Sequence, residues 1–116
     1  MKTLVSLLLL LAVVQHPAHA RVARRYSVHS HTTAQVLTLI SRRFRSLIAT
    51  KGKVDAPDAL RLLGRPDRED LGPPIGDAGG TVNTWHYRCQ DGSVYLDANC
   101  RYGYSLSGQI TDWGRE

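Results

Sequence analysis

The sequence predicts an α+β fold in which two N-terminal helices pack on one face of a small antiparallel β-meander. Apolar residues recur at helical spacing over residues 33–50, and a second, shorter helical pattern follows at 56–63. Residues 84–98 then alternate between apolar and polar around a hairpin-turn signal, and a last short strand is expected around residues 109–113. The chain has 116 residues and a net charge of +5, and 42% of its residues are hydrophobic and 22% charged. These values are typical of one small, mildly basic globular domain. They exclude collagen-like, coiled-coil and wholly disordered chains.

Residues 1–20 are predicted to be a cleaved export signal. Lys2 precedes an apolar run over residues 4–14, and the small-residue pattern Ala-His-Ala closes the segment at 18–20. The apolar run is shorter than the roughly twenty residues that a membrane-spanning helix needs. Cleavage would leave Arg21 first rather than a cysteine, so no lipid anchor is expected and the chain is predicted to be periplasmic or secreted.

Residues 21–31 are predicted to form a flexible basic arm, because they are polar and show no sustained periodicity. The pair Arg24 and Arg25 leaves a processing site open if the source is eukaryotic. His29 and His31 would share one side of an extended strand, but no nearby Cys, His or Asp completes a four-ligand metal site. We therefore expect neither a metal nor a cofactor. The folded domain is expected over residues 32–116.

The first helix is predicted near residues 33–50. Thr32 or Thr33 can cap its start, and Gly52 suits its end. At 100° per residue, one apolar stripe collects Val36, Leu37, Ile40, Phe44, Leu47 and Ile48. This stripe is expected to face the core.

The middle of this helix carries a basic outer face. Arg42 and Arg45 point away from the apolar stripe, and Arg43 flanks it. A solvated helix face is one interpretation, and a contact for an acidic partner or for anionic lipid headgroups is the other. Nucleic acid is not expected as a partner, because no aromatic side chains for base stacking lie beside the arginines and the chain is exported.

The second helix is expected near residues 56–63, because Asp55 can cap it, Pro57 suits its first turn and Gly64 ends it. The segment 68–81 that follows is rich in glycine and proline and is predicted to be a long, mobile loop. It lacks the Lys and Ser or Thr of a phosphate-binding loop.

The strongest signal for strands is the hairpin turn Asp91-Gly92. A two-residue turn there gives one buried face on which Cys89 pairs with Val94, Tyr87 with Leu96, and Trp85 with Ala98. The opposite, solvent-facing side takes Thr84, His86, Arg88, Tyr95 and Asp97. Ser107-Gly108 offers a second turn before a last strand around residues 109–113.

Cys89 and Cys100 are the only cysteines, and an even count in an exported chain usually means a disulfide. In the expected register Cys100 lies opposite residue 83, roughly 20 Å from Cys89 at about 3.3 Å per residue. A disulfide needs Cα atoms within about 7 Å. A disulfide is possible only if the second strand stops near Asp97 and residues 98–103 fold back over the sheet; otherwise the two thiols stay apart. We predict the disulfide.

Three short motifs lie in order along residues 54–113. They are Ala-Leu-Arg-Leu-Leu-Gly-Arg-Pro-Asp at 59–67, Trp-His-Tyr at 85–87 and Ser-Gly-Gln-Ile at 107–110. In these motifs the chain resembles the SmpA/OmlA (BamE-like) domain of bacterial envelope proteins, without the lipoprotein cysteine. The resemblance implies a non-catalytic binding domain, and a similar unit of two helices and a sheet occurs in secreted inhibitors of β-lactamases.

We therefore expect an exported, non-catalytic binding module that contacts another envelope or secreted protein. The preferred surface is the outer sheet face with Arg88 and Tyr95, extended by the glycine-rich loop, because Tyr and Arg often dominate interface energy. The alternative surface is the helix face with Arg42 and Arg45. Three other functions stay open: a secreted inhibitor of a hydrolase, an envelope-maintenance protein without a discrete partner, and a small enzyme using the polar face around His86. The sequence has no nucleophile-elbow motif to support an enzyme.

Overall fold

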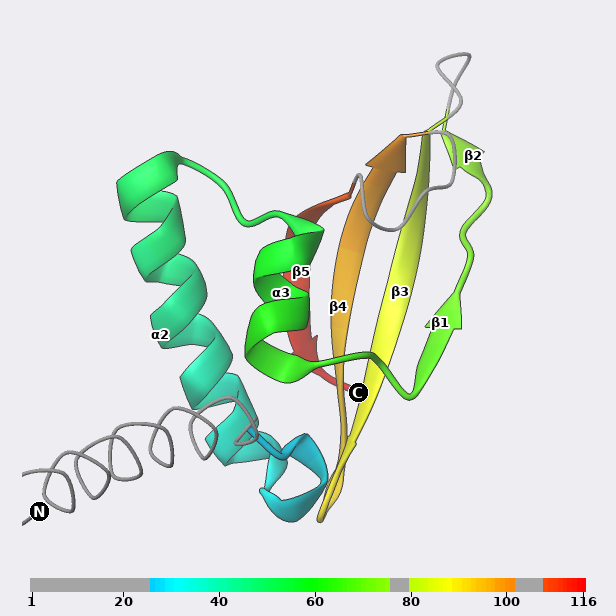
Figure 1. Ribbon diagram of the computed structural model, residues 1–116. Helices are drawn as coiled ribbons and strands as arrows, with labels where there is room; N and C mark the ends of the chain where they lie inside the picture. Colours follow the sequence, from blue (N-terminus) through cyan, green and yellow to red (C-terminus); the bar gives the residue numbers. More distant parts are fainter. Residues whose placement is uncertain (1–25, 76–79, 102–107) are drawn as a thin grey trace, which may run out of the picture.

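The computed structural model describes residues 26–75, 80–101 and 108–116. Helices precede an antiparallel sheet, which confirms the predicted α+β fold (Figure 1). The elements are η1 (Val28–Ser30), α2 (Thr33–Lys51), α3 (Ala56–Leu63), β1 (Arg68–Asp70), β2 (Pro74–Ile75), β3 (Gly80–Cys89), β4 (Gly92–Arg101) and β5 (Gln109–Arg115). The strands lie in the order β1-β3-β4-β5, and β2 also pairs with β3.

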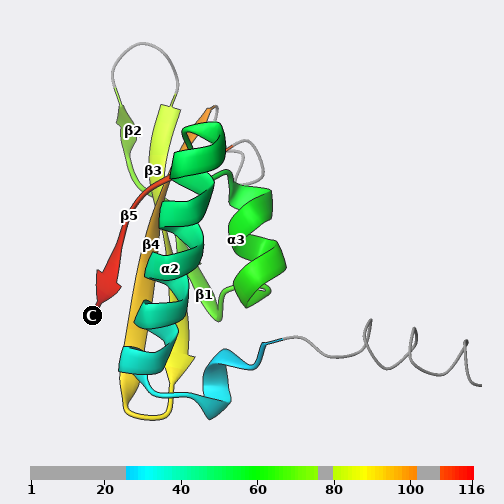
Figure 2. The ribbon, with the colours of Figure 1, turned by 90° about the vertical axis from the view of Figure 1, so that its left-hand side faces the viewer.

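Both helices cover the same face of the sheet (Figures 1 and 2). The buried side chains between the two layers include Val36, Ile40, Phe44, Ala59, Leu63, Trp85, Tyr87, Val94, Leu96, Ala98 and Ile110. Those from α2, β3 and β4 lie on the helix stripe and the strand faces that the sequence pattern assigns to the interior. For these three elements most of the core is therefore the one expected from hydrophobic periodicity.

The helix ends follow from local capping. Thr32 Oγ1 accepts a hydrogen bond from the Gln35 N–H at 3.2 Å, and Gln35 Oε1 accepts one from the Thr32 N–H at 3.0 Å. Gly52 ends α2 in the left-handed region with φ +80°, and its N–H donates to the Ile48 carbonyl at 2.9 Å. The predicted start and end of the first helix are confirmed.

A buried carboxylate joins the two helices. Asp58 Oδ2 lies 2.5 Å from Lys51 Nζ and accepts the Asp55 N–H at 3.0 Å, while Oδ1 lies 2.5 Å from the Arg61 guanidinium. Burial acts to raise the pKa of Asp58, but these hydrogen bonds outweigh it and lower the pKa to about 2.

We expect acid to weaken the fold through Asp58. The carboxyl binds a proton more readily in the unfolded chain, so its stabilising contribution is full above pH 3.8 and is lost as the pH falls towards about 2. The loss is on the order of 1 kcal/mol, because Lys51 and Arg61 are partly exposed to solvent. Urea unfolding at a series of pH values measures it. Asp58→Asn should be less stable near neutral pH and show a flatter dependence below pH 4; an equal slope in both proteins would contradict the assignment.

The β3–β4 hairpin differs from the predicted register by two residues. Gln90 and Asp91 form its turn, so that Cys89 pairs with Gly92, Tyr87 with Val94, and Trp85 with Leu96. The Asp91 carboxylate accepts the Thr33 N–H at 2.7 Å, which holds Asp91 in the turn beside the start of α2. Because a shift of two leaves every side chain on its original face, the predicted buried and exposed faces are still correct.

The structure does not join Cys89 to Cys100, so the predicted disulfide is wrong. β4 does not stop near Asp97 but pairs with β3 as far as Arg101, which places Cys100 opposite Thr81. Thr81 lies eight residues before Cys89 on β3, which is about 26 Å at about 3.3 Å per residue. That separation is well beyond the reach of a disulfide.

Residues 68–75 do not form the predicted mobile loop. β1 pairs antiparallel with β3, with Arg68 opposite His86, and β2 pairs with the start of β3. Gly72 lies between these two short strands, and its N–H donates to Asn83 Oδ1 at 3.4 Å. Residues 76–79 of the predicted loop, and Ser107 of the predicted second turn, lie outside the described residues.

We expect Gly72→Ala to loosen this edge of the sheet. A Cβ at Gly72 would lie 1.9 Å from the Val82 carbonyl oxygen, so one backbone has to move. Overpacking of this kind costs about 2 kcal/mol. Gly80→Ala is the matched control, because its Cβ would meet no atom closer than the Cys100 carbonyl oxygen at 3.4 Å. Urea unfolding of both variants checks the prediction, and equal stability would contradict the close approach.

The described end of the predicted flexible arm packs on the sheet. Val28 is buried, and the His31 carbonyl accepts the Gln90 N–H at 2.9 Å. His29 Nε2 lies 2.8 Å from Asp67 Oδ1. The prediction of a flexible arm is therefore wrong for residues 28–31, while the expected signal, Arg24 and Arg25 lie outside the described residues. None of the helices in the described ranges is long and apolar enough to cross a membrane.

Candidate binding surface

The outer face of the sheet, which the sequence favours for binding, is held together by hydrogen bonds within the face. The Tyr95 hydroxyl donates to Asp112 at 3.0 Å, and the Thr84 hydroxyl donates to Asp97 at 2.8 Å. A Cβ at Gly114 would lie only 3.1 Å from the Tyr95 ring, so the ring lies against the β5 backbone. A partner would have to break these contacts to engage Tyr95.

His86 lies on this face between two carboxylates. Its Nε2 is 2.8 Å from Asp70 Oδ2, and its Nδ1 contacts Glu116 Oε1. The side chain is only 14% exposed. Since both ring nitrogens already face a carboxylate, neither is positioned to take a proton from a substrate, as a general base must.

Arg88 borders a hollow of mixed charge on the same face. The hollow has a volume of about 310 Å³ and is lined by Asp67, Arg68, His86, Arg88, Ser93 and Glu116. Burial acts to raise the pKa of Asp67, but hydrogen bonds from the Arg88 N–H and from His29 outweigh it and lower the pKa. Acidic and basic groups are interleaved here, so the hollow does not select a partner of one charge.

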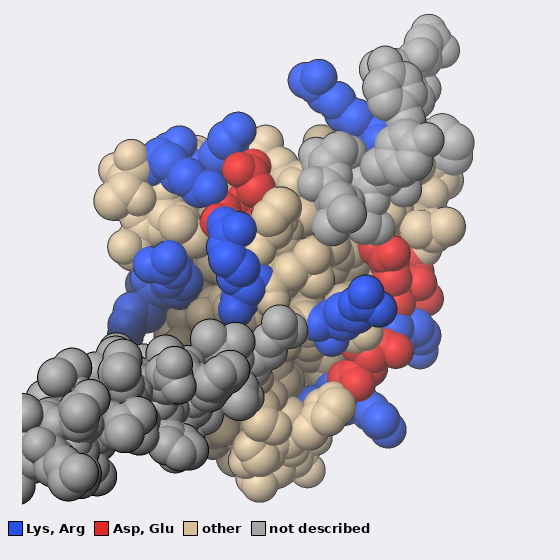
Figure 3. Space-filling view, in the orientation of Figure 1, with Lys and Arg blue, Asp and Glu red and all other residues tan. Residues whose placement is uncertain are grey.

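α2 presents a surface of one charge. Arg42, Arg43 and Arg45 are exposed, and within the described ranges no carboxylate lies at ion-pair distance from any of them. Several cations elsewhere do lie within 4.0 Å of a carboxylate, namely Lys51, Lys53, Arg61, Arg68 and Arg115. Figure 3 shows Lys and Arg side chains gathered over α2, while most of the acidic side chains in that view lie on the opposite side, over β1.

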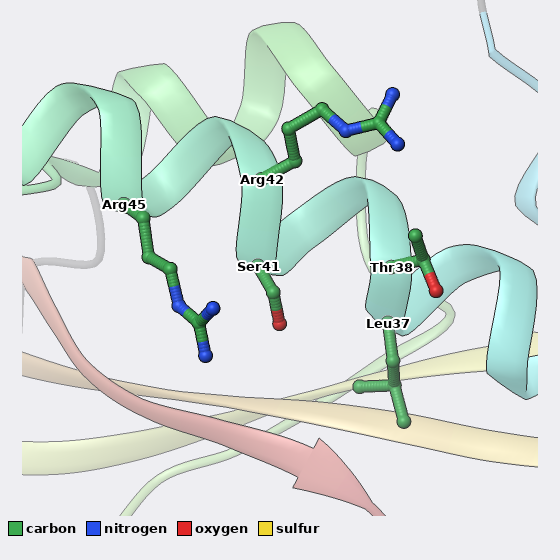
Figure 4. A pocket seen from close by; sticks show the side chains of 5 residues that line it. All are labelled: Leu37, Thr38, Ser41, Arg42 and Arg45. Atoms are coloured by element: carbon green, nitrogen blue, oxygen red, sulfur yellow. The ribbon is translucent and has the colours of Figure 1, made fainter.

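A hollow of about 490 Å³ lies against this helix and is lined by Leu37, Thr38, Ser41, Arg42 and Arg45. Figure 4 shows that the side chains of Leu37, Ser41 and Arg45 extend from α2 towards β5, whereas Arg42 points away from the strand. We call these five residues the α2 hollow. It combines two cations, two hydroxyls and one apolar side chain.

β5 is fixed beneath the hollow by Trp113. The indole Nε1–H donates to Ser41 Oγ at 3.3 Å, and the ring meets Phe44 edge to face at 5.2 Å between centroids. Ile48, which the sequence places in the buried stripe, is 46% exposed. It lies seven residues after Ser41, hence on the side of α2 that carries the hollow rather than over the core.

The candidate binding residues, which the sequence analysis selects by residue type, thus lie on two different surfaces of the structure. Arg42 and Arg45 line one hollow, whereas Arg88 and Tyr95 lie on the other face of the sheet among groups of both charges. Sequence reasoning missed Leu37 and Ser41 as surface residues of the site. Their spacing of four from each other, and of four from Ser41 to Arg45, is the signal that could have placed them beside the arginines.

Comparison of the chain with protein-family models, with curated proteins and with solved structures gives no match.

Proposed function

We propose that the chain is an exported, non-catalytic binding module that contacts another envelope or secreted protein through the α2 hollow and its arginines. The observation that carries the proposal is that Arg42, Arg43 and Arg45 are exposed together, with no carboxylate of the described chain paired to them, beside a hollow. A partner that neutralises these charges breaks no internal ion pair, and a field of one sign speeds its encounter with the chain.

Export is supported by the signal pattern of residues 1–20, which predicts a periplasmic or secreted protein. The resemblance to SmpA/OmlA domains agrees with a binding role and stays a prediction. The outer sheet face with Arg88 and Tyr95 supports binding less well, because the Tyr95 hydroxyl already donates to Asp112 and the hollow beside Arg88 is lined by groups of both charges. An enzyme at His86 is disfavoured because both ring nitrogens already face a carboxylate.

A surface of anionic lipid is the second candidate, because the same three arginines would attract phosphate headgroups. Such binding weakens steeply with salt, since exposed charges are screened within about 8 Å at physiological ionic strength. An acidic protein surface would add packing into the hollow at Leu37 and Ser41, and this part of the affinity is insensitive to salt.

Photocrosslinking in the protein's own envelope extract tests the proposal. The full chain is expressed with its leader, recovered after export, and carries a photoreactive residue at position 45 or, as a control, at the exposed position 65. We expect a defined protein adduct from position 45 that is lost with Arg42→Glu, and no such adduct from position 65. The same adducts from both positions, or none from either, would exclude a protein partner at this surface.

A further inference from the structure

We propose that the partner inserts an extended acidic segment along the edge of β5 that no other strand of the described chain pairs with, where it adds a further strand to the sheet and places a carboxylate on Arg45 of the α2 hollow. This inference rests on the proposed function and names the chemistry of the partner. It combines two neighbouring features of the described residues, namely an edge of β5 with no strand beside it past Ile110 and a hollow whose arginines meet no carboxylate.

β5 is the outermost strand on its side of the sheet (Figure 2). Within the described residues, only the beginning of β5 is covered on its outer edge. The Ala56 N–H donates to the Gly108 carbonyl at 2.8 Å, and the Ile110 N–H donates to the Val54 carbonyl at 2.8 Å. Residues 54–56 therefore form a short stub of strand on this edge, and the edge past Ile110 is where a longer strand would continue.

Past Ile110, the backbone N–H and C=O groups of Trp113 and Arg115 point away from the sheet. The Glu116 N–H donates to the Ser93 carbonyl at 3.0 Å, so Glu116 faces β4. Because the direction of N–H and C=O alternates along an antiparallel strand, those of Arg115 and Trp113 face away from β4. Within the described ranges neither residue has a backbone hydrogen bond on this outer side. They offer the two donors and two acceptors that strand addition uses.

The side chains beside this edge favour an acidic strand. Alternate side chains of an added strand would face α2, where Leu37, Ser41 and Arg45 extend towards β5 (Figure 4). A carboxylate on that face can accept charge-assisted hydrogen bonds from Arg45, while the residues on either side of it in the added strand face away from α2. A strand with Glu at every second position and small polar residues between has this pattern.

Charge argues against the two nearest alternative occupants. Residues 1–25 of the chain itself carry Lys2, Arg21, Arg24 and Arg25 and no Asp or Glu. A second copy pairing edge to edge about a two-fold axis would bring its own α2 arginines to this basic side. Anionic lipid would satisfy the arginines but supplies no strand for the backbone groups of Trp113 and Arg115.

The first test uses three blocked nine-residue peptides of alternating Thr and Glu, with the full exported chain as receptor. One is unmodified, one is N-methylated at every Glu, and one is N-methylated at every Thr. An added strand uses only one of its two edges, so we expect titration calorimetry to show at least tenfold weaker binding for one methylated peptide and unchanged binding for the other. Equal affinities for all three peptides, equal losses for both methylated peptides, or no binding of the unmodified peptide would overturn the proposal.

The second test uses variants of the chain. Arg115→Pro removes an outward N–H without touching the pairing with β4, and Arg115→Ala removes the same side chain but keeps that N–H. We expect tenfold weaker peptide binding for Arg115→Pro than for Arg115→Ala, with unchanged circular dichroism for both. We also expect tenfold weaker binding for Arg45→Glu but not for Arg65→Glu, which makes the same charge change at another exposed arginine. Equal affinities within either pair would overturn the strand proposal.

The outcomes separate this inference from the proposed function. A protein adduct at position 45 together with equal binding of all three peptides would leave the binding module in place and reject the added strand. Binding of phosphatidylglycerol vesicles that is lost with Arg45→Glu, without binding of the unmodified peptide, would reject the acidic segment in favour of lipid.

Discussion

Replacing Tyr87 by Asp is expected to unfold the protein. Tyr87 is 1% exposed on the inner face of β3, and its hydroxyl donates to the Gly64 carbonyl at 2.9 Å. Burial is the main reason why the pKa of this hydroxyl is raised, which shows how poorly the site accommodates a negative charge. An aspartate there costs several kcal/mol, of the order of the whole stability of such a small domain, about 5 kcal/mol.

Tyr87→Phe is the matched control, because it keeps the ring in the core and removes only the hydrogen bond to Gly64. Its expected cost is about 1 kcal/mol. Near-ultraviolet circular dichroism and thermal melting measure both variants. A Tyr87→Asp protein that melts with the parent would show that Tyr87 does not face the helices.

The second large effect is expected from Phe44→Ala. Phe44 is fully buried in α2 and meets the Trp113 ring edge to face, so truncation leaves a cavity between the helix and β5. Such a change costs about 3–5 kcal/mol. Leu37→Ala, on the same helix but only partly buried, should cost about 1 kcal/mol.

Urea unfolding followed by tryptophan fluorescence compares the two variants, since Trp113 itself reports on the contact. A Phe44→Ala protein as stable as Leu37→Ala would contradict the packing of α2 on β5.

The helices could be predicted almost to the residue because their end signals are local. Thr32 and Gly52 act within one turn of the ends that they define, and so do Asp55 and Gly64. The buried face of β3 and of β4 could also be predicted, because the alternation of apolar and polar residues along a strand determines it.

The strand register could not be predicted, because it depends on contacts far apart in sequence. The turn centres on Gln90 and Asp91 through the hydrogen bond from Thr33, 58 residues away. The path of residues 68–75 along β3 is likewise set by pairing rather than by its glycines and prolines. The predicted disulfide failed for a separate reason, because it required the second strand to stop near Asp97, whereas β4 pairs with β3 as far as Arg101.

Only part of the candidate site could be predicted from the sequence. Residue type selected Arg42 and Arg45, but also Arg88 and Tyr95. What distinguishes them is their surroundings: Arg88 borders a hollow that also holds carboxylates, and the Tyr95 hydroxyl donates to Asp112, whereas no carboxylate lines the α2 hollow. Tyr95 meets Asp112 only because β4 and β5 pair in this register, 17 residues apart in sequence.

The position of Trp113 under α2 also determines when the molecule can fold. The hydrogen bond from its indole to Ser41 spans 72 residues, so the layer between α2 and β5 closes only after nearly the whole described chain is present. Contacts of such long range slow folding, because chain entropy is lost before they form. During synthesis, the edge-to-face contact between Phe44 and Trp113 cannot form before β5 is present. The last strand of the chain therefore completes the packing of α2, which also contacts β4.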